Sequence, residues 1–186
     1  MANGTVKEPW LRDRIGPLDL RYRARSYGGQ DINALEEESE AVLRWACVNS
    51  ALESGIRSPL DHAILTHDHP AITDYTKQAE LPFDFERRCV SVLVDGPDGR
   101  HVITKGAPES VLDRCTLVDR NGVIVPFDDS ARAEAGRTVA RLSLAGYHLL
   151  AVAQKPGTAG QDRLSPDDER DLVLAGFVAF LDPPDP

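Results

Sequence analysis

Lys105-Gly106-Ala107-Pro108-Glu109 ends one predicted strand and begins a predicted helix, and this corner decides the fold. The run over 101–104, mostly apolar, precedes it. Pro108 suits the first turn of a helix, because an N–H at that position would have no partner within the helix. Gly106 has no side chain, so a flat ring can approach the main chain there while the Lys105 cation meets negative charge. The corner therefore predicts a binding site where strand meets helix.

Hairpin signals surround this corner. A turn over 95–99, Asp-Gly-Pro-Asp-Gly, joins predicted strands over 89–94 and 101–104, and Arg120-Asn121-Gly122 joins strands over 117–119 and 123–125. We also predict strands over 79–83, 149–153 and 172–180, an amphipathic segment from 71 to 78, and a loop over 156–166. Helices are predicted over 34–53, 109–115 and 128–145, and a further helix begins at Pro59 with Ser58 as its cap. Consecutive hairpins with helices between them predict an α+β fold, a mostly antiparallel sheet with helices packed on it.

The composition limits the kinds of partner. The chain has 186 residues, enough for one domain with a proper core, and no apolar run of about 18 residues that would span a bilayer. Its formal net charge of −9 argues against nucleic acid and against anionic lipid as partners. The three cysteines form no close pair, which fits a reducing compartment and suggests neither a disulfide framework nor a zinc site.

A second motif lies about twenty residues upstream of the corner, Pro82-Phe83-Asp84-Phe85-Glu86-Arg87-Arg88. Together with the corner and with the run over 176–184, Gly-Phe-Val-Ala-Phe-Leu-Asp-Pro-Pro, it resembles the nucleotide-binding domain of P-type ATPases, most closely the bacterial magnesium-transporting branch. The resemblance implies a twisted, mostly antiparallel sheet flanked by helices. We expect a poorly defined N-terminal segment over 1–33 with edge strand(s) of the same domain, and the nucleotide-binding domain over 34–180. The resemblance implies a hinge over 181–186 towards a phosphorylation domain.

The resemblance also assigns residues to an ATP site. Phe83 would stack on adenine, Asp61 would accept a hydrogen bond from the adenine amino group, and Lys105 would lie deep in the pocket. The full set is Asp61, Phe83, Arg88, Val90, Lys105, Gly106, Ala107, His148 and Leu150. Arginine grips phosphate with two parallel N–H bonds, which suits Arg88. We expect Glu109 to stabilise its helix end, because a carboxylate there would repel phosphate.

Two positions depart from the pattern of the family. Both His148 and Phe85 stand where related pumps often carry arginine. Histidine is mostly neutral at pH 7, so His148 should weaken ATP binding, and we expect Phe85 to serve in packing. Arg87 is expected to point to solvent or to pair with Glu86.

The resemblance implies a cytoplasmic domain of an integral membrane protein that binds ATP, accompanied by Mg²⁺. Its partners would be the phosphorylation and actuator domains of the parent pump, and we expect a monomer without direct membrane contact. The aspartate-lysine-threonine-glycine-threonine motif of the phosphorylated aspartate is absent, so we expect no hydrolysis by this chain alone. The alternative function is a regulatory or interaction module that has lost its affinity for nucleotide. A metal site around His62, His67 and His69 is disfavoured by their spacing.

Overall fold

A computed structural model describes residues 40–55, 57–66, 71–120 and 122–181. The predicted edge strand(s) over 1–33, the start of the first predicted helix, and residues 182–186 of the predicted hinge lie outside the described residues. Among the described residues, no helix combines the length and the apolar character needed to cross a bilayer.

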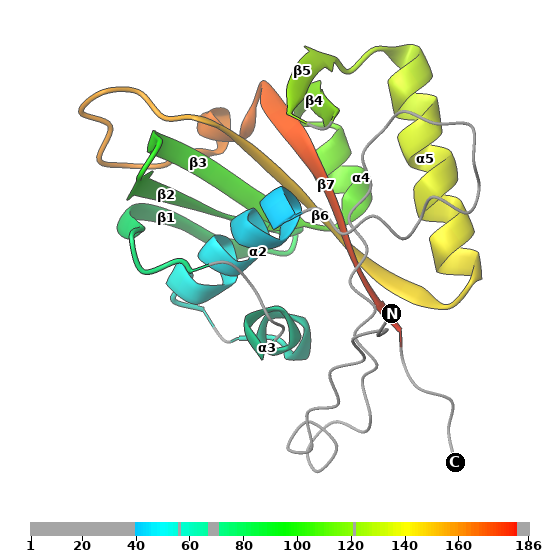
Figure 1. Cartoon of the computed structure of the whole chain (residues 1–186), viewed down its shortest axis with the longest axis horizontal. Coiled ribbons are helices and arrows are strands. Elements are labelled where there is room, and N and C mark those ends of the chain that lie inside the picture. The colour runs from blue at the N-terminus through cyan, green and yellow to red at the C-terminus, as the bar shows by residue number, and fades with distance from the viewer. Residues whose placement is uncertain (1–39, 56, 67–70, 121, 182–186) are drawn as a thin grey trace.

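One seven-stranded sheet runs through the molecule in the order β1-β2-β3-β6-β7-β4-β5 (Figure 1). Neighbouring strands are antiparallel except for β4 and β7, which are parallel. This mixed but mostly antiparallel sheet confirms the predicted α+β fold. The strands are β1 Thr76–Asp84, β2 Cys89–Gly96, β3 Gly99–Gly106, β4 Cys115–Arg120, β5 Val123–Pro126, β6 Tyr147–Pro156 and β7 Leu172–Leu181.

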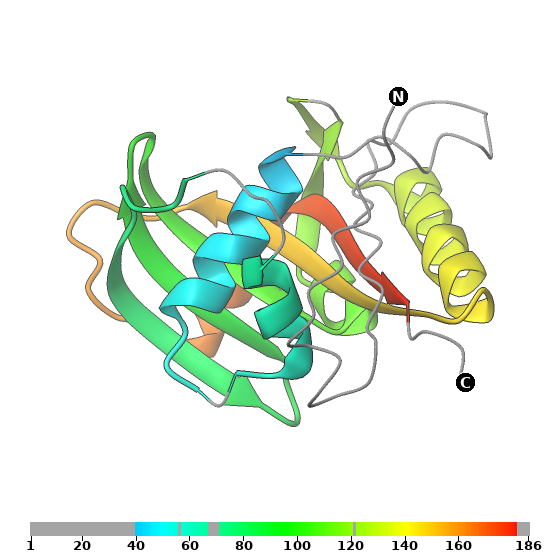
Figure 2. The ribbon, with the colours of Figure 1, turned by 60° about the horizontal axis from the view of Figure 1, so that its bottom comes forward.

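Helices cover both faces of this sheet. They are α2 Glu40–Leu52, α3 Pro59–Thr66, α4 Pro108–Leu112 and α5 Asp129–Leu144, with a 3-10 helix, η1, over Pro166–Glu169. The predicted cap of α3 is confirmed, because Asp61 N donates to Ser58 Oγ at 3.2 Å and Ser58 N donates to Asp61 Oδ2 at 2.9 Å. At α5, Asp128 Oδ1 accepts from Ala131 N at 2.9 Å. Figure 2 shows α2 and α3 lying together on one face of the sheet, where α2 contacts β2, β3, β6 and β7.

Each face has its own apolar core. On the first face, side chains of α2 and α3 pack against Val92, Val94, Ile103, Val152, Val178 and Phe180. On the second face, side chains of α4 and α5 pack against Cys89, Ala151, Ala153, Leu174 and Phe177. Because neighbouring residues of a strand point to opposite faces, β2 and β6 contribute alternately to the two cores.

The predicted boundaries need two corrections. The helix predicted over 109–115 ends at Leu112, because Cys115 begins β4, which is paired with β5 and β7. The amphipathic segment predicted over 71–78 overlaps the beginning of β1, since Thr76 already pairs with Asp95 as the first residue of that strand. In both places pairing with a distant strand overrides the local pattern. The hairpin between β2 and β3 is confirmed, with Gly96 opposite Gly99.

Candidate functional site

Lys105 lies in β3 and points into the layer of α2 and α3. Its side chain is 4% exposed. Its Nζ donates to Ser50 Oγ of α2 at 2.5 Å and to Asp61 Oδ1 of α3. A third group, Glu53, has Oε1 at 3.6 Å from Nζ. The lysine is therefore an interior cation held by two helices, which accords with the expected depth and leaves it little spare charge.

Asp61 is buried and fully occupied by donors. Its Oδ1 accepts from Lys105 and from Ser50 Oγ at 3.0 Å, and its Oδ2 accepts from Ser58 N at 2.9 Å and Ser58 Oγ at 2.6 Å. Burial acts to raise the pKa of Asp61, but the charge and hydrogen bond of Lys105 and the bonds from Ser58 outweigh it and lower the pKa to about 2. A ligand amino group that bonds to Asp61 would have to replace one of these donors, because two carboxylate oxygens offer about four acceptor positions.

Glu53 completes this cluster, and sequence reasoning missed it. It lies one residue beyond α2, and its side chain is 8% exposed. Its Oε1 is buried and accepts no hydrogen bond from the described residues. Burial raises the pKa of Glu53 from 4.5 to about 7, Lys105 opposes the rise, and the nearby Asp61 carboxylate adds to it. Glu53 is thus an unsatisfied acceptor beside the lysine. Nothing in its local sequence marks it, because it belongs to neither motif.

Phe83, in contrast, presents its ring to solvent at the end of β1, with 54% of the residue exposed. Asp84 pairs with Cys89 and Val90 pairs with Lys105. Phe83 precedes Asp84 in the irregular part of the β1–β2 ladder, and Val90 follows Cys89, so Phe83 and Val90 each lie one residue from the Asp84–Cys89 pair. The exposed ring of Phe83 and the buried cation of Lys105 thus lie on β1 and β3, the two strands that flank β2.

The expected packing role of Phe85 is wrong. Phe85 is 90% exposed, and its ring meets that of Phe83 edge to face with the centroids 5.4 Å apart. The residue lies just beyond β1 in the turn towards β2, where no helix covers it. Its contact with Phe83 gives this end of the sheet an exposed pair of aromatic rings.

Arg87 and Arg88 take opposite directions from this turn. Arg87 was expected to point to solvent or to pair with Glu86, and both expectations are wrong. Its guanidinium binds Glu169 at 2.5 Å and the Pro82 carbonyl. Arg88 has a left-handed backbone, φ 52°, and forms an ion pair with Glu109, in which both side chains are more than half exposed. Glu109 therefore holds an arginine as well as standing in the first turn of α4.

Gly106 and Ala107 join β3 to α4 in very close contact with β2. A Cβ on Gly106 would lie 2.3 Å from the Arg88 carbonyl oxygen and 2.6 Å from Cys89 Cα, so the protein's own main chain requires glycine here. Ala107 N donates to the same Arg88 carbonyl at 3.0 Å, and Ala107 is the N-cap residue of α4. The approach of a ligand ring to Gly106 is not needed to explain this glycine.

His148 and Leu150 lie on β6. Leu150 packs partly buried against the first core, and Val152, two residues on, pairs with Lys105. By alternation, His148, Leu150 and Val152 share the face of Lys105, with exposed His148 four residues, or about 13 Å, farther along the strand. Val90, Lys105, Leu150 and His148 thus share one face of the sheet with Asp61 of α3, whereas Arg88 precedes β2 and Gly106 and Ala107 lie where β3 meets α4.

Other candidate chemistry is limited. Cys47, Cys89 and Cys115 are free thiols, all buried. Burial raises the pKa of each thiol, to about 12, 11 and 12 respectively. His67 and His69 lie outside the described residues, and the described part of the chain holds no group of three metal-binding side chains.

Comparison with known proteins identifies the family. A family model described as P-type ATPase, cytoplasmic domain N, matches residues 30–186. The chain is 40% identical over 152 residues to a magnesium-transporting ATPase, P-type 1, of Salmonella typhimurium (strain LT2), which covers 78% of this chain and 17% of that protein. The corresponding protein of Escherichia coli (strain K12) is 39% identical over the same shares.

A calcium-transporting ATPase of Bacillus subtilis (strain 168) is 31% identical over 115 residues, which is 61% of this chain and 13% of the relative. The chain therefore spans only 17% of the length of its magnesium-transporting relatives. Fold, motifs and family model agree, and the chain belongs to the cytoplasmic domain N family of P-type ATPases.

Proposed function

We propose that this domain binds ATP, with Mg²⁺ accompanying the nucleotide, and presents the γ-phosphate to a separate phosphorylation domain. The parent protein would be a cation pump, and we propose magnesium as its ion because the relatives with 39 to 40% identity are magnesium-transporting ATPases. Proximity of the γ-phosphate to an aspartate supplied by another domain would drive the chemistry, so the contribution of this domain is to position the nucleotide.

The observation that supports the proposal is the exposed ring of Phe83 on β1, two strands away from the buried cation of Lys105 on β3. An exposed ring that is already fixed in place can stack on a base at little cost in conformational entropy, and stacking is worth about 1–3 kcal/mol per base. Buried Lys105 and its carboxylates offer polar groups to the edge of such a base. The charge of Lys105 is offset by Asp61, so this cluster suits an uncharged ring better than a triphosphate.

A second candidate function, a module without nucleotide affinity, is favoured by two observations. His148 stands on the face of the site, where family members carry a permanent cation, and the chain has a formal net charge of −9. Both disfavour a tetra-anion such as ATP.

Titration with ATP tests the proposal. Isothermal titration calorimetry of Phe83→Ala should show ATP binding weakened by about 5- to 150-fold, the equivalent of losing one stacking contact. Leu144→Ala is the matched control, because Leu144 is also apolar and is 89% exposed at the far end of α5. If the wild-type domain shows no heat and no amide chemical-shift changes at millimolar ATP, the module without nucleotide affinity replaces the proposed function.

A further inference from the structure

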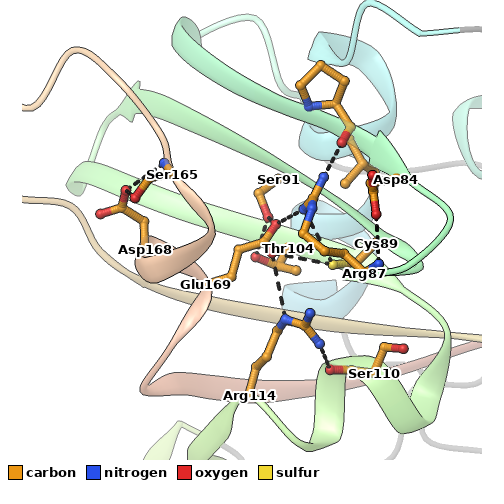
Figure 3. Close-up of polar contacts among 12 residues, drawn as sticks. Asp84, Arg87, Cys89, Ser91, Thr104, Ser110, Arg114, Ser165, Asp168 and Glu169 are labelled. Carbon is orange, nitrogen blue, oxygen red and sulfur yellow. Dashed lines mark hydrogen bonds and ion pairs between the residues drawn. The ribbon is translucent and has the colours of Figure 1, made fainter.

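Glu169 forms the centre of a second polar cluster, on the face opposite Lys105 (Figure 3). It closes η1 and is 1% exposed. Its carboxylate accepts from Arg87 Nη1 at 2.5 Å and from Ser91 Oγ at 2.6 Å, and lies 3.6 Å from Arg114 Nε. Breaking a buried ion pair from one side leaves an uncompensated charge at a cost of several kcal/mol, so Glu169 fixes the guanidinium of Arg87 firmly.

Arg87 carries this restraint to the segment that bears the exposed aromatic ring. While Nη1 binds Glu169, Nη2 donates to the main-chain carbonyl of Pro82, the residue before Phe83 (Figure 3). A planar guanidinium binds the two groups through two separate nitrogens held in a fixed geometry, whereas a lysine has a single nitrogen that would have to reach both. Glu169, Arg87 and Pro82 thus form a bridge from η1 to the strand end that carries Phe83.

The bridge acts where the sheet itself gives weak support. The pairing of β1 with β2 is irregular between Leu81 and Asp84, so the regular ladder does not fix the segment around Pro82 and Phe83. The following turn is held by Asp84, whose Oδ1 accepts from Glu86 N at 2.8 Å and Arg87 N at 2.9 Å. These bonds fix the turn, whereas the donor from Arg87 reaches back to the irregular segment.

The neighbouring cleft offers no competing explanation for the arginine. It has a volume of about 480 Å³ and is lined by Arg87, Arg114 and Arg170 together with Asp113, Glu169 and Asp171. Three positive and three negative side chains leave no excess charge to hold an anion. The cleft therefore carries no site of its own, and the structural task of Arg87 is the bridge.

We propose that Arg87 and Glu169 are positioning residues for the nucleotide site, acting from the opposite face of the sheet through the Pro82 carbonyl on the ring of Phe83. The proposal rests on the proposed ATP site. Neither side chain touches the nucleotide, and both act by holding the ring in its stacking position before ATP arrives.

A double-mutant cycle tests this route. We expect Arg87→Met to weaken ATP binding about 5- to 10-fold in the wild-type chain and less than 2-fold in the Phe83→Ala chain, because the ring through which it acts is then gone. Arg114→Met is the matched control, since Arg114 also faces Glu169 but donates to the Ser110 carbonyl at 2.5 Å instead of Pro82, and its effect should stay within 2-fold. Equal losses in both backgrounds, or no loss in the wild-type chain, would overturn the proposal.

Two further measurements separate this proposal from the others. Arg87→Lys keeps the charge beside Glu169 but replaces the two nitrogens that hold Glu169 and Pro82 with one, so its ATP affinity should also fall. This variant keeps the proposal testable if Arg87→Met does not fold. Without nucleotide, the nuclear Overhauser contact between the Phe83 and Phe85 rings should weaken in Arg87→Lys and persist in Arg114→Met. If the wild type binds no ATP, the proposed function fails, and an unchanged ring contact would refute the bridge independently.

Discussion

Glu53→Gln should change how the stability of the domain depends on pH. Glu53 has a pKa of about 7 in the folded chain against 4.5 ordinarily, because its carboxylate is buried beside Asp61 and only Lys105 offsets the charge. The folded chain therefore binds more protons than the unfolded chain between these values. Stability due to Glu53 is fully present below pH 4.5 and is lost as the pH rises through 7.

The size of this effect follows from the shift. One pKa unit corresponds to about 1.4 kcal/mol, so the difference between 4.5 and 7 is worth at most about 3 kcal/mol of unfolding free energy. A glutamine cannot ionise. Relative to wild type, Glu53→Gln should therefore gain stability progressively between pH 4.5 and pH 8, by up to about 3 kcal/mol. Urea unfolding followed by the fluorescence of buried Trp45 and by circular dichroism measures it.

Glu80→Gln is the matched control. Glu80 accepts from Ser54 N at 3.0 Å and from Lys77 Nζ at 2.9 Å, and although burial opposes them, the bonds from Ser54 and Lys77 lower its pKa. Its stabilisation is present above pH 4.5 and is lost below it, so Glu80→Gln should give a constant loss over pH 5–8. A stability difference between Glu53→Gln and wild type that is equally constant over this range would refute the reasoning on Glu53.

Three other predictions follow from single contacts. Asp61→Asn should lower the free energy of unfolding by about 3–5 kcal/mol at pH 7, measured with urea, because buried Lys105 loses its nearest carboxylate. The difference from wild type should shrink as the pH falls from about 4 towards 2, where the wild-type Asp61 takes up its proton. Gly106→Ala should destabilise the domain by about 2 kcal/mol or more, because the new methyl group clashes with the Arg88 carbonyl. Gly136→Ala is the control: this residue lies in α5 with open space around it, so the substitution should stabilise the domain by up to about 1 kcal/mol. Equal effects of the two substitutions would contradict the packing argument. His148→Arg should tighten ATP binding in calorimetry because it adds a permanent cation, and an unchanged or weaker affinity would reject that role.

The hairpins and caps of this fold could be predicted because their causes are local. Gly96 and Gly99 face each other across the turn between β2 and β3, and Gly122 takes a φ of 85° between β4 and β5. Ser58 caps α3 within three residues of its partner Asp61. In each case the residues that determine the structure lie next to one another in the chain, so the sequence pattern contains the necessary information.

The parts that could not be predicted depend on contacts between distant segments. Arg87 meets Glu169, which lies 82 positions away, and nothing near Arg87 marks that partner. Glu53 becomes an unsatisfied acceptor only because α2 brings it beside Lys105 of β3. Likewise, Gly106 is required by the approach of β2, a feature of the sheet rather than of the motif. The motifs supplied the candidate residues, and long-range packing decides how each of them is paired.

This pairing separates the two cations that the sequence assigned to one pocket. Lys105 is buried and bonded to Asp61, and removing either partner from such a pair is expensive. Arg88 is paired with Glu109 at the surface, where an ion pair is worth only about 0–1 kcal/mol. A nucleotide phosphate can therefore compete with Glu109 for Arg88 at small cost, but it cannot draw Lys105 away from its carboxylate. In the proposed ATP complex, the two charges therefore favour the base near the buried lysine and the phosphates near the exposed arginine.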